Sequence, residues 1–436
     1  MPIRSIIACL LTTLFTLPAA GQLYYLPFRV PSNPAADLRG SGLNFTVGDG
    51  SIFVGATGLS FDNVDAGVYE FDRNTYSFIK AFNPPSDPED GNFGFHLEYV
   101  DGDLLVAAPS SFSSLIGRGE VYRFNANTTA LQHTYSESSF FTFYGWNFEA
   151  DGINTIIGAP GSDEVYVYSA ITKNLVLTLE PDPMSLDTDF GYGVELNTSY
   201  LAVSAPNEFF LDREGSVYVY EYGTAALLYR LTSPIDDPGV GRANFGQYIE
   251  LVGNKLLVGY KNFGVADAFR DKVHVYDLTT GNLITTLTDD APSLDDGFGE
   301  GMSSEGNIAV IGARLDDTLA TNSGAVYIYN MDTLELIQKV LPSTGNFEGL
   351  GFGRTVHIQD GVILASASDN STTDEFNDSR FYILEQFCRQ DINLDGAIDF
   401  FDISAFIKFG IDYNNDGVFD FFDVSEFLTA YQNPCP

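Results

Sequence analysis

Short segments in which every second residue is hydrophobic recur along the chain between about residues 23 and 386. This alternation, in segments rich in valine, tyrosine and phenylalanine, is typical of half-buried β-strands. Turns rich in glycine, aspartate and asparagine separate the segments. The clearest set covers residues 68–71, 121–124, 165–168, 217–220, 273–276, 326–329 and 381–384. The pattern predicts an all-β protein made of short antiparallel strands.

An aromatic-glycine pair opens each unit of a repeat that runs through this part of the chain, and successive pairs lie 46 to 55 positions apart. The pairs are Phe93-Gly94, Tyr144-Gly145, Phe190-Gly191, Phe245-Gly246, Phe298-Gly299 and Phe352-Gly353. An apolar strand that ends in small residues follows each pair, then a Val/Tyr strand and a last strand. A four-stranded unit of this size cannot bury both of its faces alone. The repeat therefore predicts propeller blades stacked around an axis.

The Val/Tyr strands number seven, which predicts a seven-bladed β-propeller. The seventh unit lacks its fourth strand, because the chain passes from Leu384 almost directly to Cys388. The segment 23–30 is followed by prolines in the same way as 227–231, a predicted outermost strand. We therefore expect the N-terminal strand to complete the last blade and close the ring.

The aromatic-glycine pairs and the strand ends resemble the FG-GAP repeats of integrin-α-like propellers. The strand ends in question are Ala107-Ala108-Pro109, Gly158-Ala159-Pro160 and Ser204-Ala205-Pro206. The resemblance implies a propeller that binds other macromolecules, in some members with calcium in the blade loops. No blade here has an Asp-x-Asp-x-Asp-Gly loop, so the blades are not assigned calcium. The acidic loops at 62–65, 187–189, 289–296 and 374–378 are interpreted as solvated.

Residues 1–21 have the features of a secretory signal peptide. Arg4 precedes an apolar run at 6–17, and Ala19-Ala20-Gly21 supplies small residues for cleavage. The run is short for a membrane span, although an uncleaved anchor is the alternative. We expect a secreted chain, extracellular or associated with the cell surface, with a propeller over 22–386 and a separate module over 387–436.

Two copies of one acidic loop lie 21 residues apart in the C-terminal module. Calcium takes about six to eight oxygen ligands, which loops of the EF-hand type supply from positions 1, 3, 5, 7, 9 and 12. Both copies have Asp, Asn and Asp at the first three of these positions, glycine at the sharp turn, and Asp at the last two. The predicted ligands of two Ca²⁺ ions are Asp391, Asn393, Asp395, Ala397, Asp399 and Asp402, then Asp412, Asn414, Asp416, Val418, Asp420 and Asp423.

The duplicated loops resemble a dockerin, because aspartate replaces the usual glutamate at position 12 and a short predicted helix follows each loop. This resemblance implies a cohesin-like or other cell-surface receptor as partner. It also implies a partner-facing role for Phe400, Phe401, Phe421 and Phe422, the alternative being that one residue of each pair is packed. Cys388 and Cys435 are the two cysteines left after the signal peptide, and we expect them to form a disulfide.

The formal net charge of −38 argues against nucleic acid and anionic membranes as partners. No nucleophile elbow, phosphate-binding loop or zinc motif occurs, and the four histidines fall in or beside predicted strands. The sequence therefore favours a non-catalytic binding or adhesion module whose propeller takes a polysaccharide or protein ligand. Two alternatives stay open: a carbohydrate-active hydrolase or lyase, and a structural matrix component. Carboxylates beside an Arg or His in the propeller funnel would favour the enzyme, and a funnel lined by Tyr and Gly alone would disfavour it.

Overall fold

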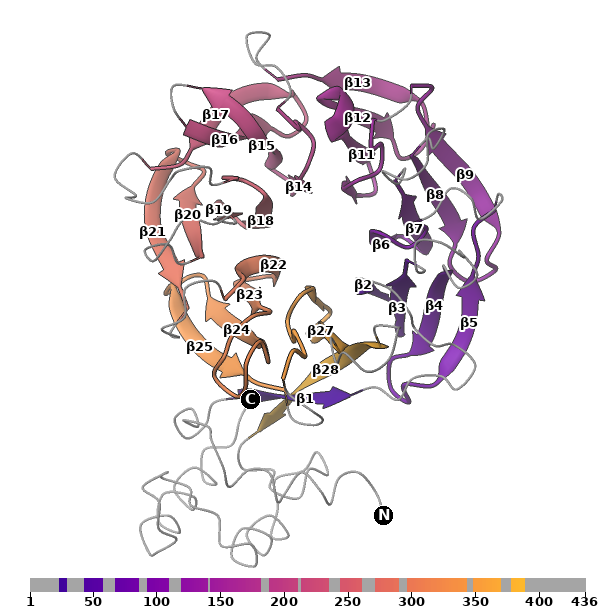
Figure 1. Cartoon of the computed structure of the whole chain (residues 1–436). Coiled ribbons are helices and arrows are strands. Elements are labelled where there is room, and N and C mark those ends of the chain that lie inside the picture. Colours follow the sequence, from indigo (N-terminus) through magenta and orange to yellow (C-terminus); the bar gives the residue numbers. More distant parts are fainter. Residues whose placement is uncertain are drawn as a thin grey trace, which may run out of the picture.

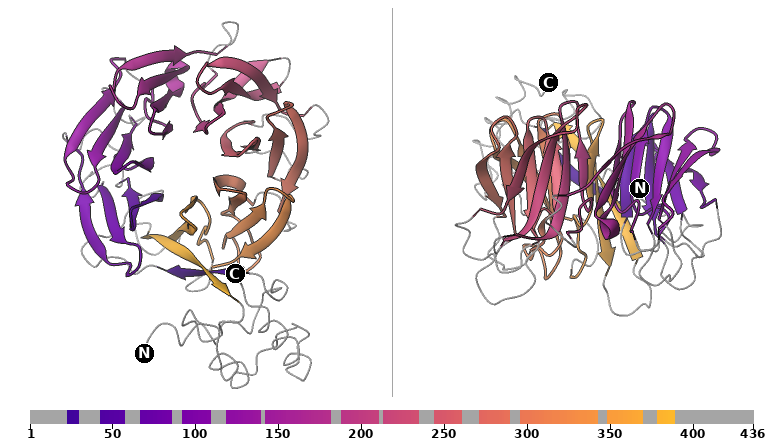
Figure 2. Two further views of the ribbon diagram at one scale, coloured as in Figure 1. Left: turned by 180° about the vertical axis from the view of Figure 1, so that it is seen from behind. Right: turned by 90° about the horizontal axis from the view of Figure 1, so that it is seen from above.

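The computed structural model describes residues 23–29, 43–57, 67–85, 92–109, 119–139, 142–181, 188–210, 213–234, 244–260, 271–289, 296–342, 348–369 and 378–388. These ranges form seven four-stranded antiparallel sheets arranged as blades around a central axis (Figure 1). Seen from the side, the strands run along that axis (Figure 2). The predicted all-β seven-bladed propeller is thus confirmed.

Each blade runs from an innermost strand beside the axis to an outermost strand at the perimeter. The innermost strands of blades 1 to 7 are β2 (Leu43–Gly48), β6 (Leu97–Val100), β10 (Phe148–Ala150), β14 (Val194–Leu196), β18 (Tyr248–Val252), β22 (Phe298–Glu305) and β26 (Val356–Gln359). The second strands are β3 (Ser51–Ala56), β7 (Asp103–Ala108), β11 (Asn154–Ala159), β15 (Tyr200–Phe210), β19 (Lys255–Tyr260), β23 (Ile308–Ala313) and β27 (Val362–Asp369).

The third strands carry the Val/Tyr pattern, and in blades 1 to 6 the outermost strands are the most exposed. The third strands are β4 (Gly67–Asp72), β8 (Glu120–Asn125), β12 (Glu164–Ser169), β16 (Arg213–Glu221), β20 (Lys272–Asp277), β24 (Ala325–Asn330) and β28 (Asp378–Cys388). The outermost strands are β5 (Phe78–Phe82), β9 (Leu131–Ser136), β13 (Leu175–Leu179), β17 (Ala226–Thr232), β21 (Asn282–Thr288), β25 (Glu335–Val340) and, in blade 7, β1 (Leu23–Arg29). A short 3-10 helix, Pro160–Ser162, follows β11.

The aromatic-glycine pairs have two separate packing roles. Their aromatic rings lie against tyrosines of the third strand in the same blade, as in Phe190 on Tyr218 at 5.3 Å between ring centroids. Their glycines adopt positive φ and approach a small residue in the second strand of the preceding blade. A Cβ on Gly312, for example, would overlap the carbonyl oxygen of Gly353. The glycines of the repeat motif therefore allow neighbouring blades to pack close together.

Apolar side chains fill each of the seven joints between neighbouring blades with a separate buried cluster. At the joint of blades 3 and 4, for instance, Ile156 and Val165 pack with Val194 and Val203. Burial therefore happens between sheets, which is why a single repeat is not expected to fold alone. Among the described residues, no helix is long and apolar enough to cross a lipid bilayer.

The N-terminal strand closes the ring as predicted. β1 pairs antiparallel with β28, from Leu23 opposite Cys388 to Arg29 opposite Tyr382. The third strand of blade 7 is longer than the segment 381–384 expected for it, since β28 spans Asp378–Cys388. The first and last described strands of the chain therefore lie side by side in one sheet.

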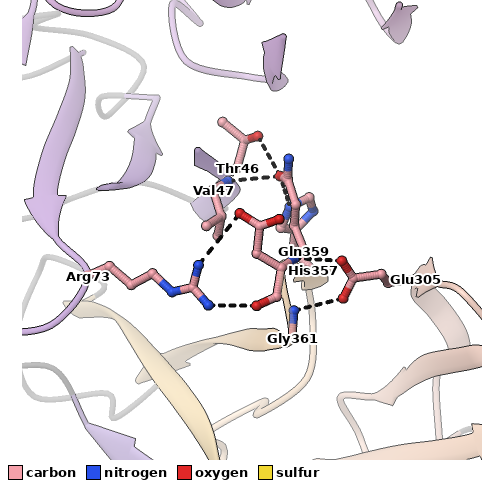
Figure 3. Close-up of polar contacts among 8 residues, drawn as sticks. Thr46, Val47, Arg73, Glu305, His357, Gln359 and Gly361 are labelled. Atoms are coloured by element: carbon pink, nitrogen blue, oxygen red, sulfur yellow. Dashed lines mark hydrogen bonds and ion pairs between the residues drawn. The ribbon is translucent and has the colours of Figure 1, made fainter. Parts of the chain in front are cut away.

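Side chains from three blades also meet at the closing blade, as Figure 3 shows. Glu305 of blade 6 accepts hydrogen bonds from the backbone amides of Asp360 and Gly361, at 2.7 and 2.8 Å. Arg73 of blade 1 donates to the Asp360 carbonyl at 2.6 Å and pairs with its carboxylate at 3.5 Å. These contacts fasten the turn after β26 from both sides, at the end of the channel where the innermost strands finish.

Candidate functional site

The seven innermost strands enclose a channel whose cavity volume is about 840 Å³. Two sets of side chains line it at fixed places in the repeat. The residue directly after each aromatic-glycine pair lies at the end where the innermost strands begin, and we call this set the rim residues. The residue four positions after each of these glycines lies deeper, and we call this set, with Thr46 of blade 1, the ladder residues.

The ladder residues join the innermost strands into a circle, because most of them accept a backbone N–H from the next blade. Five joints are built in this way: Thr46 accepts from Tyr99, Glu98 from Ala150, Glu195 from Leu251, Glu250 from Ser304, and Ser303 from Ile358. At the joint of blades 7 and 1 the acceptor is instead Gln359, which receives the Val47 amide at 3.1 Å. The glutamates of the channel are therefore in large part structural acceptors between blades.

Glu149 departs from this arrangement. At its joint the amide of Val194 donates instead to Asn147, at 3.0 Å. Within the described part of the chain, no group donates a hydrogen bond to the Glu149 carboxylate. Burial raises the pKa of Glu149 well above its usual range, and the charges of Glu98 and Glu250 add to this. Among the described ladder glutamates, Glu149 is thus the one that accepts no hydrogen bond at all, whereas Glu98 accepts the Ala150 amide and only its Oε2 lacks a partner.

The other three ladder glutamates also have raised pKa values, in each case mainly because burial disfavours the charged form. Burial raises the pKa of Glu250 to about 7, while hydrogen bonds from Ser304 act in the opposite direction. All four glutamates are half-buried, because each of them lines the cavity. The charged form of these glutamates is nevertheless disfavoured, since the seven blades surround the channel around its whole circumference.

Two histidines, His96 and His357, line the same channel. Burial lowers the pKa of His96 to about 4, and the nearby His357 lowers it further. His357 Nε2 lies 3.1 Å from the Gln359 side-chain oxygen, which already accepts the Val47 amide. An amide oxygen cannot donate, so His357 carries its proton on Nε2. The sequence placed these histidines in strands, but it did not reveal that two of them share the channel.

Three aromatic rim residues form a continuous arc over blades 2, 3 and 4. The ring centroids of Phe95 and Trp146 are 4.9 Å apart, and those of Trp146 and Tyr192 are 5.5 Å apart. The Tyr192 hydroxyl accepts hydrogen bonds from the Gln247 amide and the Trp146 indole. All three rings are half-buried, so each is held in place while part of it stays exposed to the cavity. We call this set the aromatic arc.

Charged rim residues face the aromatic arc from blades 6 and 7. Arg314, at the end of β23, donates to both carboxylate oxygens of Glu300, through Nε to one and through Nη2 at 3.3 Å to the other. Arg354 is exposed, and no described residue accepts a hydrogen bond from its guanidinium. Partial desolvation of the guanidinium by the surrounding protein and the Arg314 charge lower the pKa of Arg354, while Glu300 raises it. The mouth of the channel thus has an apolar, aromatic side and a cationic side.

The two end residues of one acidic loop are not solvated as expected. Asp289 and Asp296 are 7% and 2% exposed. Burial, followed by the Asp289 carboxyl group, raises the pKa of Asp296 to about 8. The interpretation of 289–296 as a solvated loop is therefore wrong for the two residues at its ends, because their side chains are buried. Among the described residues, no group of three or more His, Cys, Asp or Glu side chains has the arrangement of a metal site.

The C-terminal sites predicted from the sequence lie outside the described residues. This holds for all twelve calcium ligands between Asp391 and Asp423, for the four phenylalanines and for Cys435, while Cys388 is described only as the last residue of β28. The signal peptide at 1–21 is likewise outside the described ranges. The structure instead points to the channel, which the sequence analysis considered as a funnel without identifying any of the residues that line it.

Comparison with known proteins supports the propeller. The FG-GAP repeat family matches residues 283–329, which include the Phe298-Gly299 pair and the strand end Gly312-Ala313. Integrin alpha-4 of Xenopus laevis is 24% identical over 191 residues, 40% of this chain. That alignment covers 18% of the integrin chain. The similarity is therefore to an FG-GAP propeller, over a small part of a much longer relative.

Proposed function

We propose that this protein is an extracellular binding or adhesion module that uses the mouth of its propeller channel to hold a ligand. The observation that carries the proposal is that two sets of side chains in the channel have different roles. Ladder glutamates at three joints accept hydrogen bonds between blades, whereas at the mouth the aromatic arc lies opposite Arg354, whose guanidinium donates to no described residue. A concave site with a few placed polar groups beside aromatic rings is the usual form of a ligand pocket. The FG-GAP similarity agrees with a binding role.

The finer parts of the proposal concern the two ends of the chain. Residues 1–21 direct export, and residues 387–436 form a dockerin-like module that binds two Ca²⁺ ions and docks onto a cohesin-like or other cell-surface receptor. The spacing of the two loops supports the calcium sites, since every side-chain ligand position holds an Asp or Asn. In this arrangement the tail anchors the protein and the propeller presents the binding site.

The anchoring role is tested with the full-length mature chain immobilised on a surface. Detergent-extracted envelope proteins are passed over it in calcium and in chelator, beside a variant that carries Asp391→Ala and Asp412→Ala. We expect capture in calcium, lost both in chelator and in the double variant, because both changes empty the loops. Glu335→Ala with Glu120→Ala is the matched control, since it also removes two acidic side chains. Equal capture by wild type and loop variant would remove the anchoring role.

A second candidate function is a carbohydrate-active hydrolase or lyase with its active site in the channel. Glu149 favours it, because a carboxyl group with a raised pKa and open acceptor positions has the properties of a general acid. Glu149→Gln keeps the size of the side chain and removes its titration. Depolymerisation of a polysaccharide by the wild type but not by Glu149→Gln would establish the enzyme. Equal and negligible turnover by both proteins would leave the binding module.

A further inference from the structure

The rim of the channel has two unlike walls, and their placement specifies a class of ligand. The blades follow one another in sequence around a ring of seven, so the wall across from blade 3 belongs to blades 6 and 7 (Figure 1). Trp146 of blade 3 therefore faces Glu300 and Arg354 across the cavity mouth. Any ligand that enters the mouth meets aromatic rings on one side and a guanidinium on the other.

The aromatic wall is suited to a flat, weakly polar face. Its rings are fixed by mutual packing and by the hydrogen bonds from Trp146 and Gln247 to Tyr192, so little side-chain freedom is lost on binding. The Phe95, Trp146 and Tyr192 rings lie with 45° and 47° between neighbouring planes, which makes a curved surface rather than a closed cage. A six-membered sugar ring presents such a face, with C–H groups on the flat side and hydroxyls at the edge.

The opposite wall is suited to an anionic group. Arg314 is held by its two-point contact with Glu300, whereas among the described residues none accepts a hydrogen bond from the Arg354 guanidinium at the rim. A guanidinium binds a planar carboxylate through two parallel hydrogen bonds, and such a pair is stronger than a neutral hydrogen bond. An exposed arginine at the mouth of a cavity is notable in a chain with a net charge of −38.

We propose that the channel mouth binds an acidic saccharide, with one sugar ring stacked on the aromatic arc and its carboxylate paired with Arg354. This rests on the proposed binding function and names its ligand class. The ladder glutamates lie deeper in the channel, below the rim, so the carboxylate of the ligand would face Arg354 rather than those glutamates.

Trp146 is the single tryptophan of the chain, so its fluorescence reports directly on this site. The full-length protein is titrated with short oligomers of galacturonate, glucuronate and mannuronate, and with their methyl esters, which keep the sugar ring and lose the charge. We expect a saturable fluorescence change with at least one acid, and weaker binding of its ester by about tenfold, the loss of one charge-assisted contact.

Three variants separate the two walls, with binding measured by calorimetry so that the tryptophan is not needed. Arg354→Gln should weaken the acid about tenfold and remove its advantage over the ester. Trp146→Ala should weaken acid and ester alike, and Trp146→Phe should restore part of the affinity and serves if the alanine variant does not fold. Arg73→Gln is the control, because it removes an arginine at the other end of the channel and should change neither.

Several outcomes would overturn the inference. One is that no uronate oligomer binds at millimolar concentration, and another is equal affinity of wild type for acid and ester. A third is tight binding of a quaternary ammonium probe that Arg354→Gln strengthens, which would make the rim a cation site. If the Trp146 fluorescence changes saturably with a neutral oligosaccharide but with no uronate, this inference fails while the proposed use of the channel mouth as a binding site stands.

Discussion

The side-chain oxygen of Gln359 accepts a hydrogen bond of 3.1 Å from the backbone N–H of Val47, across 312 positions of sequence. The Thr46 hydroxyl lies 3.3 Å from the same oxygen. Val47 is completely buried, so its N–H has no access to solvent. At the joint where blade 7 meets blade 1, Gln359 therefore takes the place of a ladder residue as the acceptor. One glutamine side chain thus completes the circle of inter-blade hydrogen bonds.

Gln359→Ala should therefore destabilise the propeller by about 1–3 kcal/mol, because the buried Val47 amide would be left without an acceptor. Denaturant unfolding measures the change. Gln132→Ala is the control, since Gln132 makes an exposed contact with Asp103 within one blade, and it should cost only a few tenths of a kcal/mol. Equal effects of the two changes would contradict the role given to Gln359.

Gly312→Ala should destabilise by about 1–3 kcal/mol or more, because the added Cβ would overlap the Gly353 carbonyl and force blades 6 and 7 apart. Gly67→Ala is the matched control. Its Cβ would meet its nearest neighbours at 3.5 Å, an ordinary contact, and its φ is not positive. Thermal unfolding of both variants distinguishes close approach between blades from the general effect of replacing a glycine.

The stability of the wild type should rise as the pH falls from about 8 through 7. Glu250 has a folded-state pKa of about 7, above its usual 4.5. Between pH 4.5 and about 7 the folded state therefore binds more protons than the unfolded state. The other three ladder glutamates act in the same direction. Glu250→Gln keeps the acceptor for Ser304, and should be more stable than wild type at pH 8 and less dependent on pH. A steeper dependence in the variant would contradict this.

Below pH 6.5 His96 acts in the opposite sense. Its folded-state pKa of about 4 lies below its usual 6.5, so in that range the unfolded state binds the extra proton. The stability that depends on neutral His96 is present above pH 6.5 and is lost as the pH falls through 4. His96→Gln should therefore flatten the acid limb of the stability curve. An unchanged limb in this variant would assign the loss to other groups.

Two calcium ions and one disulfide are expected from the C-terminal sequence. Calorimetric titration of the chelator-treated protein should give two equivalents of Ca²⁺, with one lost in Asp395→Ala and one in Asp416→Ala. Asp332→Ala, an exposed aspartate of the propeller, should retain both. Mass spectrometry after thiol alkylation should find Cys388 and Cys435 unmodified without reductant. One equivalent of calcium in the wild type, or two labelled thiols, would refute the corresponding expectation.

The propeller was predictable because each strand carries its own local signal and the signal repeats. Closure by the N-terminal strand was predictable because the last unit lacked one strand, and β1 paired with β28 as expected. The residues that line the channel were not identified, because its glutamates were scattered among many acids. Their signal is nevertheless regular, since Glu98, Glu149, Glu195 and Glu250 each follow the glycine of an aromatic-glycine pair by four positions.

The burial of Asp289 and Asp296 has no comparable signal in the sequence. Acidic residues in a loop are ordinarily solvated, and only the packing of neighbouring blades decides which of them are buried. The sequence likewise does not show that Arg314, rather than Arg354, makes the two-point contact with Glu300. That pairing depends on which strands the ring brings together.

The pairing of β1 with β28 also has a mechanical consequence. A force applied to the chain beyond Cys388 enters the propeller along β28, which is hydrogen-bonded on one side to β27 and on the other to β1. Such a pull loads both ladders in shear, so many hydrogen bonds resist together instead of opening one after another. Resistance to such a force depends on the rate of unfolding rather than on equilibrium stability. A propeller sealed in this way should therefore resist a pull on β28, the direction from which the proposed C-terminal anchor would load it.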